Sequence, residues 1–106
     1  TAKFGENVIT FVGGVPKNEI NRPLVSQLVR SATSIGANYM EANEASSKKD
    51  FRNKVSICRK EANESKHWLR MLAHANSVQA ERCRTLWKEA HELTLIFAKI
   101  VKTCEM

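Results

Sequence analysis

Apolar residues recur along most of this chain at the spacing of an α-helix. The clearest run lies in residues 48–75, where apolar or small residues alternate by four and three positions without a slip. This spacing is typical of the seam between helices that pack at about +20°. The seam consists of Phe51, Val55, Cys58, Ala62, Ser65, Leu69 and Leu72. We therefore predict a helix of about 40 Å that packs along its length against neighbouring helices.

Three further stretches show helical periodicity. They predict a short amphipathic helix over residues 3–13, a second helix over 22–45 and a fourth over 78–103. Short connections between helices force neighbours to run antiparallel. The predicted fold is all-α: an antiparallel up-down four-helix bundle, with one short N-terminal helix and three long helices, forming a single domain over residues 1–106.

The ends of these helices carry their own signals. Gly13 and the following glycine are expected to end the first helix. Asn21 suits the N-cap of the second helix. Ser47, followed three residues later by Asp50, is a capping signal for the third.

The stretch Arg30–Ala42 is rich in small residues. Of the eight residues at 31–38, only Ile35 is large. Gly36 costs about 1 kcal/mol relative to alanine inside a helix, so a compensating contact is expected. Small side chains let another backbone approach closely, and two apolar stripes on this helix indicate two neighbours. We therefore expect the second helix to be central, with close backbone contact at Gly36.

Positive charge is concentrated in one segment. The chain carries a net charge of +6, and residues 48–76 hold eight basic against three acidic residues. At about 100° per residue, five of the basic side chains fall within an arc of about 40°. We call this set the basic rail: Lys48, Arg52, Arg59, Lys66 and Arg70. A row of cations of this kind is one way to bind the phosphates of a nucleic acid.

The residues alone leave more than one interpretation of this helix open. The basic rail is either a phosphate-binding surface or an ordinary solvated helix face. No aromatic residue is interleaved with it, so contacts to the RNA backbone are expected rather than stacking on bases. A surplus of apolar residues, including Trp68 and Met71, instead favours an interface, with a closed homo-oligomer as the default form.

Glu61 falls among the apolar residues of the third helix. A buried carboxylate needs a hydrogen-bonding or charged partner, which Arg30, Ser34 or Tyr39 of the second helix could supply. Glu41 shares a face of the second helix with Arg30 and is expected to join the same structural network.

Catalytic and metal chemistry find little support. Glu64 and His67 form a Glu-x-x-His unit of the kind that supplies di-iron ligands in carboxylate bundles, but such a site needs a second copy. Glu89 and His91 have the wrong spacing for one. No nucleophile, second acid or glycine-rich phosphate loop accompanies Glu61. We expect no metal, no cofactor and no enzymatic activity.

The cysteines indicate the compartment. Cys58, Cys83 and Cys104 are odd in number and lack metal-type spacing, so we interpret them as reduced thiols of a cytoplasmic protein. The longest uncharged apolar run near the C-terminus, residues 93–98, is far shorter than the ~20 residues of a membrane span. We expect no membrane partner.

Several segments closely resemble one bacterial family of four-helix-bundle proteins. They are Arg-Ser-Ala-Thr-Ser-Ile-Gly-Ala-Asn-Tyr-Met-Glu-Ala at 30–42, Asp-Phe at 50–51, Lys-Glu-Ala at 60–62, and Glu-Ser-Lys-His-Trp-Leu-Arg-Met-Leu at 64–72. The family comprises proteins encoded by intervening sequences in 23S ribosomal RNA genes, and related members act as accessory proteins of diversity-generating retroelements. The resemblance covers nearly the whole chain.

This resemblance implies a cytosolic four-helix bundle that assembles as a homopentamer with a basic surface and associates with RNA or an RNA-handling protein. It brings no catalytic residues. Its matching positions, expected to be structural, are Gly36, Asn38, Glu41, Glu61 and Trp68. Our leading expectation is a non-enzymatic homo-oligomer that binds RNA or a ribonucleoprotein through the phosphate backbone. The alternative is a protein–protein interaction scaffold with no nucleic-acid role.

Overall fold

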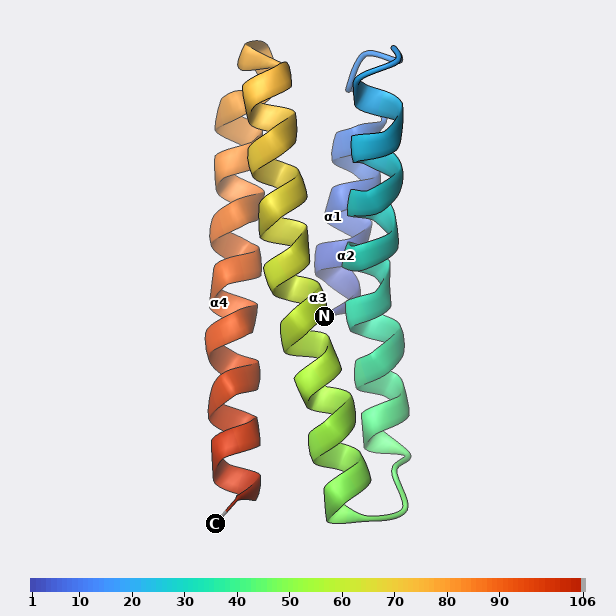
Figure 1. The fold of residues 1–106 in the computed structure, drawn as a ribbon, viewed down its shortest axis with the longest axis vertical. Helices are drawn as coiled ribbons and strands as arrows, with labels where there is room; N and C mark the ends of the chain where they lie inside the picture. Colours follow the sequence, from blue (N-terminus) through green and yellow to red (C-terminus); the bar gives the residue numbers. More distant parts are fainter. Residues whose placement is uncertain (106) are drawn as a thin grey trace.

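The computed structural model describes residues 1–105 and consists of helices joined by short connections. The helices are α1 (Ala2–Val12), α2 (Asn21–Asn43), α3 (Lys48–Ala75) and α4 (Ala80–Cys104), with one 3₁₀ turn at Ser77–Gln79. Figure 1 shows α2, α3 and α4 side by side with alternating directions, and α1 behind α2. The molecule measures 45 × 19 × 18 Å. The prediction of an all-α up-down bundle with one short and three long helices is confirmed.

Both α2 and α3 occupy inner positions in the bundle. Helix α3 packs against α2 on one side and α4 on the other, whereas α1 packs against α2 and, less extensively, α4. The two apolar stripes of α2 therefore do face two neighbours, α1 and α3. The 4-3 seam of α3 likewise packs against two neighbours, α2 and α4. Both α2 and α3 are therefore central helices.

The core runs the length of the bundle and is built from the predicted stripes. All seam residues of α3 are buried except Phe51, which is half-buried near the start of the helix. The largest apolar side chains with almost no exposure are Phe97, Leu28, Ile35, Leu69, Leu72, Val8 and Val55. Burying one such side chain contributes about 1.5–3 kcal/mol. The burial of these side chains is therefore the main favourable contribution to the free energy of folding.

The two capping predictions have different outcomes. Ser47 is the N-cap of α3, and its hydroxyl accepts the backbone N–H of Asp50 at 3.0 Å, as predicted. Asn21 is not the N-cap of α2, because it is already the first residue of the helix. The side-chain oxygen of Asn18 instead accepts the backbone N–H groups of Ile20 and Asn21, at 3.1 and 2.8 Å. A residue three positions earlier thus satisfies the first donors of the helix.

Asn21 instead forms side-chain hydrogen bonds to two other segments at this end of the bundle. Its side-chain amide exchanges two hydrogen bonds with the amide of Asn76, each 2.8 Å long, and also donates to the carbonyl of Pro16. Asn76 follows α3, so this pair ties the start of α2 to the turn between α3 and α4. Asn21 is 2% exposed, which makes the pair a buried polar contact between segments far apart in the sequence.

Small residues let the helices approach at two places along α2. The Ser31 and Ser65 hydroxyls meet at 2.8 Å between α2 and α3. On the other side, a Cβ at Gly36 would lie 3.4 Å from the Cα of Ala2, at the start of α1. The expected backbone contact at Gly36 is therefore with α1. It is an ordinary van der Waals distance, with room for a methyl group.

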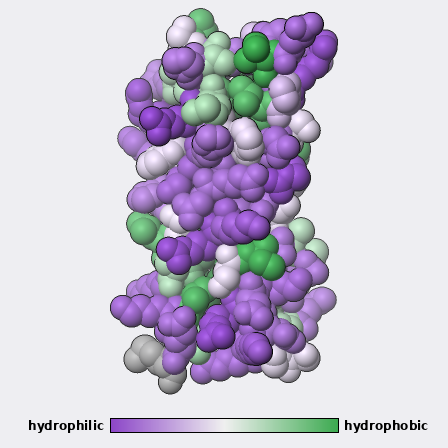
Figure 2. All heavy atoms as spheres, in the orientation of Figure 1, coloured by the Kyte–Doolittle hydropathy of each residue, from purple (hydrophilic) through white to green (hydrophobic). Residues whose placement is uncertain are grey.

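The surface is largely polar. Figure 2 shows hydrophilic residues across the middle of one face and hydrophobic residues only in separate groups. No helix within residues 1–105 combines the length and apolarity that a membrane span requires. The large apolar side chains that remain exposed are Ile9, Ile20, Met40, Ile57, Val78, Leu95 and Ile96. Trp68 is not among them, because its ring packs against the core.

Candidate nucleic-acid interface

The basic rail follows the boundary between α3 and α4. Lys48 and Arg52, near the start of α3, line a hollow of 240 Å³ together with Lys49 and with Cys104 from the end of α4. Arg70, near the other end of α3, lines a second cavity with residues of α4. Lys48, Arg59 and Arg70 are exposed, and Arg52 and Lys66 are half-buried. The predicted cations thus share one side of the molecule over most of its length.

Lys66 lies one turn before Arg70 in the rail and contacts two aromatic side chains of α4. Its Nζ is 3.1 Å from Nδ1 of His91 and 5.0 Å from the centre of the Trp87 ring. The Trp87 and His91 rings are stacked, with centroids 5.2 Å apart and 13° between their planes. The sequence argument found no aromatic residue among the cations of α3. The tertiary structure differs because α4 brings two aromatic rings to the same place.

The rail cations form no ion pairs with the acidic residues of the described chain. The ion pairs within residues 1–105 join Arg30 to Glu61 and Glu64, and Lys54 to Glu41. None of them involves a rail residue. The rail charges are therefore available to an external anion without first breaking an internal pair.

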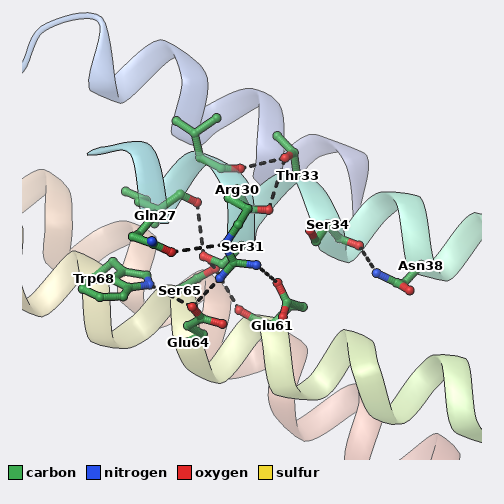
Figure 3. A network of polar contacts seen from close by, with 12 residues as sticks. Gln27, Arg30, Ser31, Thr33, Ser34, Asn38, Glu61, Glu64, Ser65 and Trp68 are labelled. Atoms are coloured by element: carbon green, nitrogen blue, oxygen red, sulfur yellow. Dashed lines mark hydrogen bonds and ion pairs between the residues drawn. The ribbon is translucent and has the colours of Figure 1, made fainter. Parts of the chain in front are cut away.

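A polar network occupies the α2–α3 interface, on a different side of α3 (Figure 3). Arg30 donates to Glu61 at 3.0 Å, to Glu64, and through Nε to Gln27 at 3.2 Å. The Trp68 indole N–H donates to Glu64 at 3.2 Å. The hydrogen bond from Arg30 is the main cause of the lowered pKa of Glu64, and burial of the carboxyl opposes it. Arg30 is thus the partner that buried Glu61 requires.

Three residues expected to be structural lie outside this network. Glu41 is exposed and pairs with Lys54 at 3.5 Å, and it lies 11 residues, or about three helical turns, after Arg30 in α2. Gly36 faces Ala2 of α1, on the other side of α2. Asn38 donates to the carbonyl of Ser34 within its own helix. Of the residues expected to be structural, Glu61 and Trp68 join Arg30 in this network, Trp68 through Glu64.

The cysteines are free and two of them are unreactive by position. Burial raises the pKa of Cys58 and of Cys83 to about 11, so both stay protonated thiols at neutral pH. The Cys58 Sγ also lies 3.5 Å from the carbonyl of Ile35 on α2. Both side chains act as small core residues.

The side chains of Glu64 and His67 are not placed to bind a metal ion together. Glu64 is held by Arg30 and Trp68, while His67 is exposed and lies edge-on to the Trp68 ring. Within residues 1–105, no three His, Cys, Asp or Glu side chains are placed to share a metal ion.

Three residues of the interface were missed by the sequence argument: Arg84, Trp87 and His91. Arg84 and Trp87 line the cavity that also contains Arg70. All three are on α4, and their position beside the rail depends on the register between two helices. Their own spacing, at i, i+3 and i+7, was a signal that they share a face of α4, but it did not say which neighbour that face meets.

Fold and surface together define a class: a small antiparallel helical bundle with a row of cations on one side that form no ion pair within residues 1–105. The model of the 23S rRNA-intervening sequence protein family matches residues 1–99, and the chain belongs to this family. Its fold is similar to the crystal structure of a protein of unknown function of the S23 ribosomal protein family from Bacteroides thetaiotaomicron. The two are 32% identical, with a TM-score of 0.82 over 94% of this chain and 93% of the other. No curated protein matches the chain.

Proposed function

We propose that this protein is a non-enzymatic, homo-oligomeric RNA-binding protein of the cytoplasm that contacts the phosphate backbone through the basic rail. The observation that carries the proposal is the alignment of five cations along the α3–α4 boundary, none of them in an ion pair within residues 1–105. Cations arranged at intervals along a 45 Å body match a linear polyanion better than a compact anionic ligand.

The family adds support for RNA as the polyanion. It is named for the intervening sequences of 23S ribosomal RNA. The crystal structure with the similar fold is described as a protein of unknown function, and it adds nothing on ligands. The partner in this proposal is a structured RNA or a ribonucleoprotein recognised mainly by its charge.

Salt dependence tests the electrostatic basis. Five phosphate contacts predict that affinity for a structured RNA falls roughly 100- to 500-fold between about 50 and about 200 mM salt, because bound cations displace counterions. Fluorescence anisotropy with nuclease-treated protein would measure this loss. Affinity that is the same at both salt concentrations would contradict the proposal.

Charge reversal tests the location. The triple variant Arg52→Glu, Arg59→Glu, Lys66→Glu is expected to abolish binding while its far-UV circular dichroism remains helical. The matched control is Lys3→Glu, Lys17→Glu, Arg22→Glu, which changes net charge equally at exposed positions away from the α3–α4 boundary. Equal losses in both variants would mean that net charge, and not the rail, governs binding.

A protein–protein scaffold is the second candidate. Its supporting observation is the groove of 380 Å³ between α1 and α2, where Ile9 and Met40 are 52% and 64% exposed. Exposed apolar side chains along a groove are typical of contact surfaces between proteins. Pull-down with and without nuclease separates the candidates, since a partner retained after nuclease treatment favours the scaffold.

A further inference from the structure

A small cavity lies between α3 and α4 beside one end of the basic rail. Its volume is 150 Å³. Trp87 forms part of its lining, Arg70 and Arg84 come from the two helices, and the remaining residues are small or apolar: Leu69, Ala73, Ala80 and Cys83. The cavity therefore combines an apolar interior, one aromatic ring and two guanidinium groups.

The arrangement of charge around the cavity points to an anionic ligand with an apolar, planar part. Neither Arg70 nor Arg84 is in an ion pair within the described chain, and both are exposed. Lys66 adds a third cation nearby, because its Nζ lies 5.0 Å from the centre of the Trp87 ring and 3.1 Å from Nδ1 of His91. No acidic side chain lines the cavity.

The size of the cavity limits which kind of ligand it can hold. Sites for free small molecules usually measure about 300–1,000 Å³, so this cavity is small for a free metabolite. It suits a single ring system that belongs to a longer chain whose other contacts lie outside it. The basic rail continues from the cavity along α3, which is where the rest of such a chain would bind.

We propose that this cavity holds one unpaired base of single-stranded RNA against Trp87, with the adjoining phosphates on Arg70 and Arg84. The proposal rests on the proposed function and names the form of RNA that is bound at this end of the rail. Stacking of a base on an aromatic ring is tolerant of sequence, because every base has a π-face. A base in a duplex is paired and stacked, and cannot enter.

The two tryptophans allow a direct test. Trp68 lies in the α2–α3 network with Glu64, so the variant Trp68→Phe leaves Trp87 as the single tryptophan, which can be excited selectively. We expect a 12-nucleotide oligoadenylate to quench Trp87 fluorescence in a saturable manner at about 50 mM salt. A strand of equal length made of abasic residues, and a blunt duplex, should bind without quenching. The matched variant Trp87→Phe, which keeps only Trp68, should show no quenching with any of them.

Affinity gives the second measurement. Trp87→Leu is expected to weaken oligoadenylate binding about tenfold, or about 1.4 kcal/mol, because the stack of one base on the ring is lost. The same variant should bind the abasic strand and the duplex as the unmodified protein does. Trp68 does not line the cavity, so the variant Trp68→Phe leaves the cavity intact. The quenching experiment therefore tests the base site even if Trp87→Leu does not fold.

The outcomes separate this inference from the function on which it rests. If oligoadenylate and the abasic strand bind equally well and neither quenches Trp87, the base site is wrong and the phosphate-binding rail stands. If no RNA binds in a salt-dependent manner, both the rail and the base site are wrong.

Discussion

Arg30 is half-exposed, but it is the ion-pair partner of Glu61, the most buried carboxylate within residues 1–105. Its guanidinium reaches Glu61, whose side chain is only 9% exposed, together with Glu64 and Gln27. Removing Arg30 would leave a buried acceptor without its partner, which costs about 1–3 kcal/mol. An exposed ion pair alone would contribute less, at most about 1 kcal/mol. The importance of Arg30 therefore comes from Glu61 more than from Glu64.

The Glu64 carboxylate predicts a pH dependence. Its pKa is lowered, first by the hydrogen bond from Arg30, so its contribution to stability is present above the unfolded pKa of about 4.3 and is lost as pH falls through the folded value. We expect Glu64→Gln to lower the free energy of unfolding at pH 7 by less than about 1 kcal/mol. Urea denaturation at pH 7 and at steps of decreasing pH should show the difference shrinking as the pH falls below the unfolded pKa of about 4.3.

The control for this measurement is Glu19→Gln. Glu19 is exposed in the α1–α2 connection and forms no ion pair within residues 1–105. Its substitution should leave the stability curve unchanged between these pH values. A difference for Glu64→Gln that grows as pH falls would contradict the role assigned to the Arg30 hydrogen bond.

Gly36 predicts opposite results for a small and a large side chain. A Cβ would meet the Ala2 backbone at 3.4 Å, which is ordinary contact, and alanine is the better helix former by about 1 kcal/mol. Gly36→Ala should therefore be neutral or stabilise by up to about 1 kcal/mol. Gly36→Leu should destabilise by about 1–3 kcal/mol, because its longer side chain forces α1 away. Equal stabilities for the two variants in urea would show that α1 does not pack closely here.

At the scale of elements, the α2 start and the α3–α4 turn are joined by one pair of amides. Asn21→Ala and Asn76→Ala should each lower the free energy of unfolding by about 1–3 kcal/mol, since each removes both hydrogen bonds between the two partly buried amides. In a double-mutant cycle the two losses should be less than additive, with a coupling of about 0.5–3 kcal/mol.

Exposed Asn53→Ala is the matched control, and its free energy of unfolding should stay within about 0.5 kcal/mol of that of the unmodified protein. Additive losses would mean that the two amides act separately.

At the scale of the whole molecule, the exposed apolar groove between α1 and α2 bears on assembly. Native mass spectrometry is expected to give a multiple of the 12.0 kDa subunit, and the family resemblance implies five copies. The double variant Ile9→Lys, Met40→Lys should lower this mass, because two charges would have to be buried at a contact between copies. Val78→Lys is the control, as Val78 is 92% exposed in the turn outside the groove. A monomeric protein, or dissociation by Val78→Lys alone, would contradict this surface.

The features that could be predicted from sequence are those set by neighbours along the chain. The 4-3 spacing from Phe51 to Leu72 depends only on helical geometry, and α3 begins and ends at the predicted residues. The capping of α3 by Ser47 also depends on residues three apart. The same holds for the basic rail, whose members share a face of one helix. The need of Glu61 for a partner followed from its place among apolar residues, although its partner was one of three candidates.

What tertiary structure alone decided is how one helix lies against the next. The register between α3 and α4 brings Trp87 and His91 to Lys66. The spacing of residues within either helix does not predict that register. The path of the α1–α2 connection puts Asn18 at the cap and frees Asn21 for Asn76, 55 residues away. Glu41 shares a helix with Arg30 but meets Lys54 instead. Helical periodicity determines which side chains share a face, because it acts over four residues. Which surfaces meet depends on packing summed over the whole bundle, and that is why the aromatic part of the interface appeared only in three dimensions.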